Sequence, residues 1–272
     1  MTNIVPASQS AFLSIDHVTD LAGSLKLITF EDGFRCYSHS SIEETQFFYN
    51  QIMVNKEYLG SGNMLDDHPC VVDVGANIGL FTLFIKSKWP GAKVHAFEPI
   101  PETFDVLQRN VDLYDHHQVF VHPYGLGAAV EERTFYYYPR MTGSTTSTPE
   151  LKQHQRSYMD REAGKIITQH FFKTQMRKAP VLPLSSFIEG EKIHTIDLLK
   201  IDVEGDELSV LQGISPDHYC RIKRMIVETH SSDLSIQVSN LLLENGFTIS
   251  NDLVLKSPGE ATEIVAVNLH PA

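Results

Sequence analysis

The chain has 272 residues, a length that fits one domain of generous size or one domain that carries an elaborated cap. Hydrophobic residues make up 42% of it and charged residues 21%, as in globular proteins that bury a core. The net charge of −12 argues against a general nucleic-acid-binding protein, because neutralising phosphates requires a concentrated basic surface. No apolar run approaches the roughly 18 residues of a membrane span. From the charge we therefore expect no nucleic acid as a partner, and from the lack of such a run no membrane.

The three cysteines, Cys36, Cys70 and Cys220, are far apart and form no Cys-x-x-Cys pair. We interpret them as reduced thiols that pack as small hydrophobic side chains. The first basic residue is Lys26, so the amino end lacks the positively charged region of a secretory signal. These features predict a cytoplasmic protein.

Residues 1–68 form an N-terminal segment in which one helix is predicted. Between Ser41 and Leu59 the apolar residues recur at the spacing of an amphipathic helix, with Ser41 as the N-cap and Glu44 three residues later. The glycine-containing stretch 60–63 ends this pattern. We therefore expect a helical cap that packs against the body of the protein or covers its ligand cleft.

The body, residues 69–272, alternates short apolar runs with helix patterns, which is typical of a parallel sheet with helices on both faces. Two runs near the carboxyl end, 253–256 and 263–268, flank Pro258-Gly259 and predict an antiparallel hairpin at the sheet edge. The expected fold is α/β, with a mostly parallel, seven-stranded, Rossmann-like sheet. The other strands are expected at 70–74, 93–97, 118–122, 196–201 and 224–228, and the helices at 80–88, 101–114, 206–211 and 232–245.

A polar insertion interrupts the body at about residues 141–179. It opens with the run from Gly143 to Pro149, which is too polar to pack a core and predicts a mobile loop. Between Glu150 and Lys178 it holds seven Lys or Arg residues against three Asp or Glu residues, a net charge of +4 within an acidic chain. Two interpretations stay open: a solvated surface helix, or a lid that contacts an anionic substrate or an acidic partner.

A glycine-containing turn follows the first strand of the body, in the run from Asp73 to Gly79. Gly75 permits a sharp turn and Gly79 a close approach of the backbone, at the strand end where open α/β sheets bind ligands. The run lacks the spacing of a dinucleotide or Walker motif, and Asp73 suits a cationic ligand such as S-adenosylmethionine. Glu98 ends the next strand, where a carboxylate binds both hydroxyls of a ribose. The pair indicates an adenosine-containing cofactor, with NAD as the competitor.

Four motifs together resemble the FkbM-type S-adenosylmethionine-dependent methyltransferases: Val72 to Gly79, Phe97-Glu98-Pro99, Gly143-Ser144, and Leu199 to Glu207. The most specific of them is Lys-Ile-Asp-Val-Glu-Gly at 200–205, and the similarity extends over about residues 46–246. The resemblance implies a class I methyltransferase fold, S-adenosylmethionine as the methyl donor, and O-methylation of natural products or sugars. The cofactor-binding residues that we predict are Asp73, Gly75, Asn77, Gly79, Glu98, Gly125 and Asp202.

Acidic residues gather after the fourth strand of the body, where Asp202, Glu204, Asp206 and Glu207 lie close together in the sequence. We interpret Asp206 and Glu207 as favourable charges at the amino end of a helix. Strand alternation places Asp202 and Glu204 on one side, and the adjacent parallel strand brings His230 near them. These three residues are the predicted chemical site.

Two chemistries fit this site. In the first, His230 is a general base that removes the hydroxyl proton of the acceptor, while Glu204 or Asp202 orients its ring. In the second, the three side chains bind a divalent cation, Mn²⁺ or Mg²⁺, which binds the substrate oxygen and lowers its pKa.

The leading hypothesis is a methyltransferase that modifies a hydroxyl of a small-molecule natural-product intermediate, such as a polyketide. This acceptor is either free or presented by an acyl carrier protein. The alternatives are a metal-dependent sugar or glycoconjugate O-methyltransferase, an NAD-linked oxidoreductase and a non-catalytic cofactor-binding module.

Overall fold

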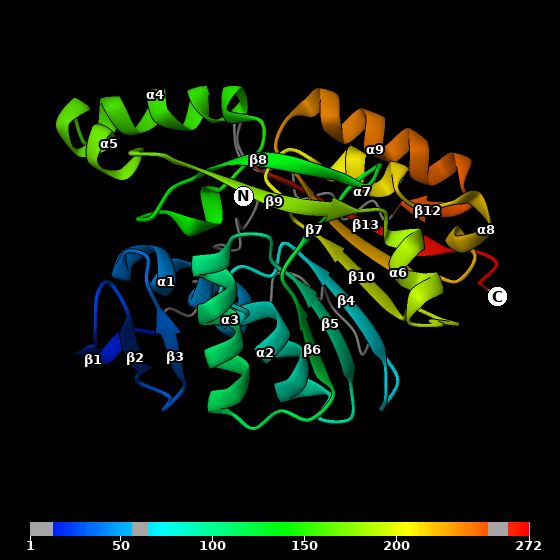
Figure 1. Ribbon diagram of the computed structural model, residues 1–272, viewed down its shortest axis with the longest axis horizontal. Helices are drawn as coiled ribbons and strands as arrows, with labels where there is room; N and C mark the ends of the chain where they lie inside the picture. The colour runs from blue at the N-terminus through cyan, green and yellow to red at the C-terminus, as the bar shows by residue number, and fades with distance from the viewer. Residues whose placement is uncertain (1–12, 56–64, 250–260, 272) are drawn as a thin grey trace, which may run out of the picture.

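The computed structural model describes residues 13–55, 65–249 and 261–271. Its centre is a seven-stranded sheet in the order β12-β13-β11-β10-β4-β5-β6 (Figure 1). From β11 to β6 all neighbouring strands are parallel, whereas β13 is antiparallel to both β11 and β12. The predicted fold class is therefore confirmed. The strands are β4 (Cys70–Val74), β5 (Lys93–Phe97), β6 (Val119–His122), β10 (Leu198–Ile201), β11 (Arg224–Thr229), β12 (Phe247–Ile249) and β13 (Thr262–Asn268).

The predicted antiparallel pair forms the sheet edge as β12 and β13. Its first strand differs from our expectation, because Phe247–Ile249 pairs with β13 directly after the preceding helix. The run 253–256, which we predicted for this place, lies outside the described residues.

Helices cover both faces of the sheet, and the alternation of side chains along each strand decides which helices a residue meets. Val72 and Val74 of β4 pack in the core cluster that contains residues of α6, α7 and α9. Val71 and Val94 pack on the opposite face, with residues of α2 and of the N-terminal segment. No helix of the described ranges is long and apolar enough to cross a membrane. The helices of the body are α2 (Leu80–Lys88), α3 (Pro101–Leu113), α6 (Leu184–Gly190), α7 (Glu207–Gln212), α8 (Pro216–Tyr219) and α9 (Ser232–Glu244).

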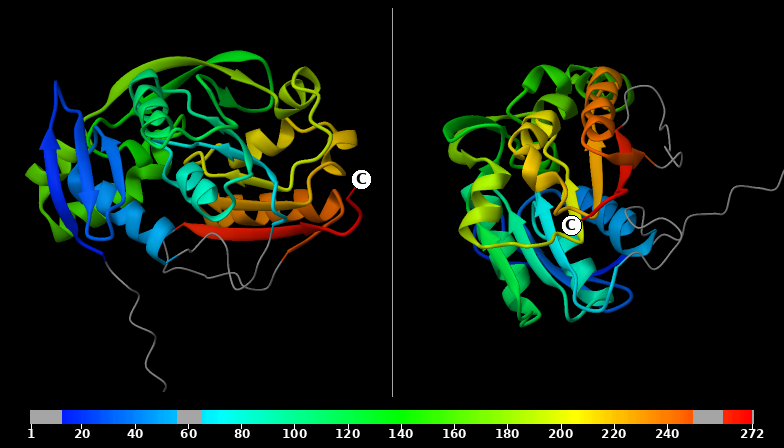
Figure 2. Two further views of the ribbon diagram at one scale, coloured as in Figure 1. Left: turned by 90° about the horizontal axis from the view of Figure 1, so that it is seen from below. Right: turned by 90° about the vertical axis from the view of Figure 1, so that its right-hand side faces the viewer.

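The N-terminal segment contains the predicted helix as α1 (Ile42–Tyr49), continued by the π-helix η1 (Asn50–Val54). Ser41 is its N-cap, since its hydroxyl accepts a hydrogen bond from the Glu44 amide at 3.1 Å. The segment also contains an antiparallel sheet that we did not predict, at one end of the molecule (Figures 1 and 2). The Asp32-Gly33 pair between two apolar runs is a hairpin signal that could have revealed it. Its strands are β1 (Ile15–Asp20), β2 (Lys26–Phe30) and β3 (Arg35–Ser38).

A second small sheet of order β7-β9-β8 carries the insertion (Figure 1). The insertion holds two helices, α4 (Gln153–Glu162) and α5 (Lys165–Phe171), which we call the lid. The 3₁₀ turns η3 (Thr142–Ser144) and η4 (Pro149–Lys152) precede it. The strands are β7 (Gly125–Leu126), β8 (Glu131–Tyr137) and β9 (Gln175–Leu182).

Our expectation of a mobile loop between Gly143 and Pro149 is wrong. Ser144 and Thr146 are buried, and Thr146 exchanges backbone hydrogen bonds with Tyr136 of β8. Small hydroxyl side chains can be buried at low cost when each finds a hydrogen-bond partner, as the Thr146 hydroxyl does on the Glu204 carbonyl at 2.6 Å. The polar composition of residues 143–149 therefore reflects a hydrogen-bonded, partly buried segment rather than a solvated loop.

Candidate active site

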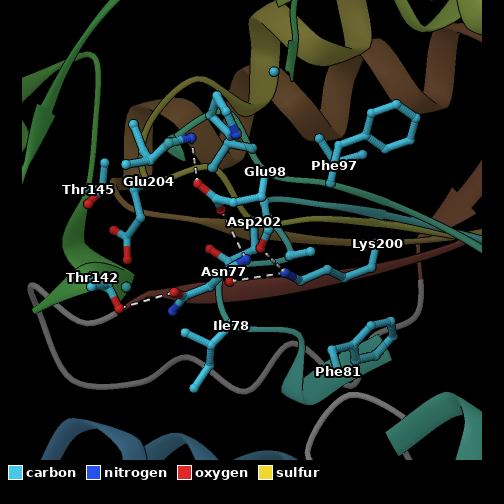
Figure 3. Close-up of a pocket in the computed structure, with 18 of the residues that line it drawn as sticks. Asn77, Ile78, Phe81, Phe97, Glu98, Thr142, Thr145, Lys200, Asp202 and Glu204 are labelled. Atoms are coloured by element: carbon cyan, nitrogen blue, oxygen red, sulfur yellow. Dashed lines mark hydrogen bonds and ion pairs between the residues drawn. The ribbon is translucent and has the colours of Figure 1, made fainter. Parts of the chain in front are cut away.

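A pocket lies at the carboxyl ends of β4, β5 and β10, at the place predicted for the cofactor (Figure 3). Phe48 of α1 and Ile52 of η1 also line it, so the N-terminal segment covers the cleft as expected. Of the predicted cofactor residues, Gly75, Asn77, Glu98, Gly125 and Asp202 line the pocket. Asp73 and Gly79 do not.

Gly75 allows the turn after β4 to approach the backbone that follows β10. Its φ is +76°, and a Cβ at this position would overlap the backbone carbonyl oxygen of Asp202. Only glycine combines this backbone conformation with so close an approach. Gly79 has φ +90°, and a Cβ there would meet the Leu107 side chain of α3. Gly79 therefore serves helix packing and does not line the pocket in which we predicted its ligand contact.

Asp73 lies behind the pocket wall, which corrects the predicted contact with a cationic ligand. Its side chain is fully buried, and it accepts a hydrogen bond from the Thr82 hydroxyl of α2 at 2.7 Å. The reason is strand parity: residues 71 and 73 face α2, whereas 72 and 74 face the opposite layer. Asp73 is beside Lys200 in the register of β4 and β10, and the two charged groups are 3.4 Å apart.

Lys200 joins three elements of the pocket and is a residue to which sequence reasoning assigned no role. Its ammonium donates to the Gly75 carbonyl at 3.0 Å and lies 3.4 Å from both Asp73 and Asp202. Burial alone would lower the pKa of Lys200, but Asp202 and Asp73 raise it, so the buried ammonium stays charged. Asp73 therefore acts through Lys200, which supports the turn at Gly75.

Glu98 is held in position for a ligand. One carboxylate oxygen accepts the Ile100 amide at 2.9 Å and the other accepts the Asn77 amide at 3.1 Å. Each oxygen retains a further lone pair for the hydroxyls of a ribose. Burial raises the pKa of Glu98 to about 7.

A set of hydrogen bonds from Glu44 connects α1 with the turn η3. Glu44 accepts the amides of Thr142 and Gly143 at 2.9 and 3.1 Å, and the Thr142 hydroxyl donates to Asn77 at 3.1 Å. A Cβ at Gly143 would overlap the Phe48 ring, so the cap packs tightly on this turn. Burial raises the pKa of Glu44 to about 7. Sequence reasoning treated Glu44 only as part of the helix start.

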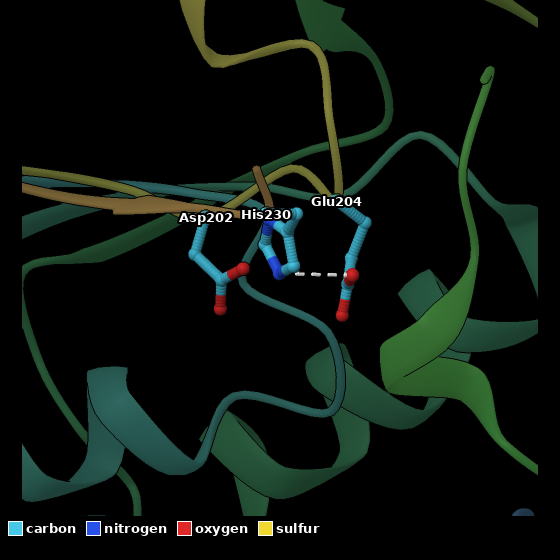
Figure 4. Close-up of side chains that lie close together, drawn as sticks. All are labelled: Asp202, Glu204 and His230. Atoms are coloured by element: carbon cyan, nitrogen blue, oxygen red, sulfur yellow. Dashed lines mark ion pairs between the residues drawn. The ribbon is translucent and has the colours of Figure 1, made fainter. Parts of the chain in front are cut away.

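The predicted chemical site assembles as expected, with Asp202, Glu204 and His230 side by side (Figure 4). A ligand atom from each lies within 4.8 Å of the others. The parallel pairing of β10 with β11 produces this proximity, because the carboxyl ends of neighbouring parallel strands meet at one edge. Asp202 and Glu204 line the pocket.

His230 lies between two carboxylates, an arrangement that favours the protonated ring over the resting general base that we predicted. Nε2 is 3.0 Å from Glu204 and Nδ1 is 3.2 Å from Glu207. Burial opposes protonation, but Glu204 and Glu207 raise the pKa of His230 well above 6.5. An imidazolium with both nitrogens engaged has no lone pair for a substrate proton. His230 instead positions Glu204.

Asp206 and Glu207 lie at the amino end of α7, as predicted, and each also has partners that the sequence did not show. Glu207 is buried and accepts the amides of Val203 and Gly205 at 3.3 and 2.9 Å, so it shapes the loop that carries Glu204. Asp206 lines the pocket and pairs with Arg133 at 3.0 Å. Local sequence shows only charges near a helix start, whereas these partners come from the fold.

Glu204 connects the insertion with the predicted chemical site. Its φ is +56°, an uncommon conformation for a residue with a side chain, and its carboxylate pairs with both His230 and Lys152 of η4. Burial alone would raise the pKa of Glu204, but His230 and Lys152 hold it well below its usual range. Glu204 is therefore an ionised carboxylate facing the pocket.

Comparisons with known proteins agree with this geometry. A family model described as the methyltransferase FkbM domain matches residues 73–249. The methyltransferase sdnD of Sordaria araneosa is 34% identical over 246 residues, which cover 86% of this chain and 94% of that protein. The 31-O-demethyl-FK506 methyltransferase FkbM of Streptomyces tacrolimicus is 32% identical over 224 residues, which cover 78% and 85%.

The chain belongs to the FkbM methyltransferase family. The crystal structure of the methyltransferase FkbM from Methylobacillus flagellatus KT shares its fold, with a TM-score of 0.52 and 17% identity. That match covers 84% of this chain and 55% of that chain. These findings identify a methyltransferase and set aside the NAD-linked oxidoreductase and the non-catalytic module.

The donor of an FkbM methyltransferase is S-adenosylmethionine, and the pocket suits its parts. Glu98 faces the space with acceptors for ribose hydroxyls, and Leu126 and Phe135 add apolar surface for a base. Asp202 lines the same pocket and presents a carboxylate that would neutralise a cationic methionine tail.

The pKa of Glu98 predicts a pH-dependent affinity for S-adenosylmethionine. The ionised carboxylate accepts ribose hydroxyls more strongly than the neutral acid, so affinity should rise as pH increases through about 7. Glu98→Gln should weaken binding by about tenfold at pH 8 and abolish this rise, since hydrogen bonds to charged groups contribute about 1.5–3 kcal/mol. Isothermal titration calorimetry from pH 6 to pH 8 measures both effects.

The same shift predicts a stability change of opposite sign in the ligand-free protein. Between the unfolded value of 4.5 and about 7, folded Glu98 retains a proton that the unfolded chain releases, so this group destabilises the fold as pH rises through that window. Exposed Glu132→Gln is the control and should leave both profiles unchanged. An unaltered pH profile of binding in Glu98→Gln would exclude Glu98 as the ribose ligand.

Proposed function

We propose that this FkbM methyltransferase transfers a methyl group from S-adenosylmethionine to a hydroxyl of a small-molecule natural-product intermediate. The observation that carries the proposal is Glu204, an ionised carboxylate that lines the donor pocket and is held there by His230 and Lys152. The name of the Streptomyces relative, 31-O-demethyl-FK506 methyltransferase, indicates methylation of an oxygen.

Methyl transfer to a hydroxyl can proceed with a weak base such as a carboxylate and does not require a strong one. As the oxygen attacks the methyl carbon, the C–O bond forms, the C–S bond breaks, and the hydroxyl becomes strongly acidic. A weakly basic carboxylate can orient the hydroxyl by accepting its hydrogen bond and take the proton late in the step. His230 keeps Glu204 ionised before the reaction, and Asp202 offers a second acceptor in the pocket.

We infer a free small-molecule acceptor, because part of the positive charge of the insertion is already paired within the chain. Of the seven basic residues in the insertion, Lys152, Arg177 and Lys178 pair with carboxylates of the same chain. Among the described residues, the other four, Arg156, Arg161, Lys165 and Lys173, form no ion pair, so an intermediate presented by an acidic acyl carrier protein is the alternative.

Two measurements test the proposal. Calorimetry should detect S-adenosylmethionine binding, and a screen of hydroxylated metabolites with methyl-labelled donor should give a product whose label resists acid and base as an ether does. Label released by mild base would indicate a methyl ester. Label stable on nitrogen or carbon would likewise overturn O-methylation.

Metal-assisted transfer is a second candidate, favoured by the donor set of Asp202, Glu204 and His230. A cation at this site would have to displace the proton from Nε2 of His230; two carboxylates and the neutral imidazole would then suit Mn²⁺ or Mg²⁺, while Nδ1 still faces Glu207, as in many metal-binding histidines. A bound cation would stabilise the substrate oxygenate. The hexuronic acid methyltransferase AglP of Haloferax volcanii, 28% identical over 172 residues, is a relative named for a sugar-acid substrate. Loss of turnover in chelator and recovery with Mn²⁺ would establish this version.

A further inference from the structure

A second cavity of about 430 Å³ lies under the lid, between β8 and the segment that carries η4 and α4. Its volume falls within the usual range of small-molecule sites. None of its lining residues has a role in the donor pocket except Lys152. The cavity is lined by Tyr136, Tyr138, Pro149, Glu150, Lys152, Gln153, Arg156, Phe172 and Thr174.

This cavity adjoins the donor pocket. Lys152 lines the cavity, and its ammonium pairs with Glu204, which lines the donor pocket. Thr146, which lies between them, bonds to Tyr136 of the cavity wall on one side and to the Glu204 carbonyl on the other. A molecule in the cavity that extends past Lys152 would therefore bring a hydroxyl to Glu204.

The walls of the cavity differ in character. Tyr138 and Phe172 are buried and pack edge to face with centroids 5.7 Å apart, so they form a rigid aromatic wall. Glu150 and Arg156, which carry opposite charges, also line the cavity, and both are exposed. Within residues 13–55, 65–249 and 261–271 no carboxylate forms an ion pair with Arg156, whereas the Lys152 charge is neutralised by Glu204.

We propose that this cavity is the acceptor site, and that it selects a ring-containing hydroxyl compound with an anionic substituent, such as a carboxylate, that pairs with Arg156. The proposal rests on the proposed methyl transfer and deepens it by naming the substrate class. The ring packs on Tyr138 and Phe172, the hydroxyl reaches Glu204, and the anion lies beside Arg156. Arg156 is one helical turn beyond Lys152, so the two cations lie on one side of the segment.

The experiment measures binding of two hydroxylated cyclic carboxylates, hydroxyphenylpropionate and hydroxycyclohexanecarboxylate, each against its primary amide. Ligand-observed NMR titrations are made with the donor pocket filled by S-adenosylhomocysteine. The acids should bind about three- to fivefold more tightly than the amides, the range expected for one solvent-accessible ion pair. Arg156→Ala should abolish this preference. Arg161→Ala, on the same helix with its guanidinium over the Tyr158 ring, should retain it.

Glu150→Gln separates an anionic acceptor from a neutral polyol. Removing this negative charge should leave binding of the acids unchanged or tighter, whereas a polyol site that uses both side chains would be weakened by either substitution. Equal binding of acids and amides, no binding of any of the four compounds, or a preference that survives Arg156→Ala would overturn the proposal. Calorimetry with S-adenosylhomocysteine is run on each variant, so a failure of donor binding, which concerns the methyltransferase function, is recognised separately.

Discussion

Lys200→Met is expected to destabilise the protein by about 3–5 kcal/mol, the range for breaking a buried ion pair from one side. The substitution removes the ammonium that lies 3.4 Å from Asp73, whose carboxylate is fully buried and retains only the Thr82 hydroxyl. The Gly75 carbonyl also loses its 3.0 Å hydrogen bond, so donor binding should weaken as well. Urea unfolding measures the first effect and calorimetry the second.

A double variant tests whether the unpaired charge of Asp73 causes the loss of stability. Asp73→Asn combined with Lys200→Met removes both charges, so it should recover part of the stability that Lys200→Met alone loses. The control, Lys178→Met, breaks an exposed pair with Glu132 and should leave the urea midpoint unchanged. If Lys200→Met cost less than about 1 kcal/mol, the ion pairs of Lys200 with Asp73 and Asp202 would not support the turn at Gly75 as we infer.

Glu204→Gln is expected to lower kcat by about 10²–10⁴-fold, the usual contribution of a positioned proton acceptor, while affinity for S-adenosylmethionine stays within about twofold. The amide has nearly the same shape but loses the negative charge that pairs with His230 and Lys152. The pKa of His230 should fall toward 6.5, because one of the two carboxylates that raise it is gone. Initial-rate kinetics and an NMR titration of the His230 ring measure these effects.

The NMR titration separates the catalytic role from a structural one. A variant that merely disturbed folding would lose donor binding together with turnover, whereas the expected variant retains binding and shows a lowered pKa at His230. Glu132→Gln is the matched control at an exposed site and should leave kcat unchanged. A Glu204→Gln enzyme with kcat within threefold of wild type would remove Glu204 from the mechanism and shift the proton-acceptor role to Asp202.

The order of strands and helices in the body could be predicted because each element has its own local spacing of apolar residues. Runs such as Cys70–Val74 and Lys93–Phe97 are apolar and short, and each is followed by a helix pattern. The neighbouring places of Asp202, Glu204 and His230 followed from the same reasoning, since parallel strands end at one edge. By contrast, β7 and β9 pair across more than fifty residues, and no local pattern specifies such a partner.

The sequence by itself determined the fold class, the turn at Gly75, the carboxylate at Glu98 and the acidic loop after β10, because each depends on residue type and short-range spacing. Only the tertiary structure decided what those groups do. Strand parity turned Asp73 toward α2 and Lys200, and Glu207, buried at the start of α7, joined Glu204 in making His230 a cation. The physical reason is that protonation and hydrogen bonding depend on burial and on partners brought together by folding, neither of which is visible in a short stretch of sequence.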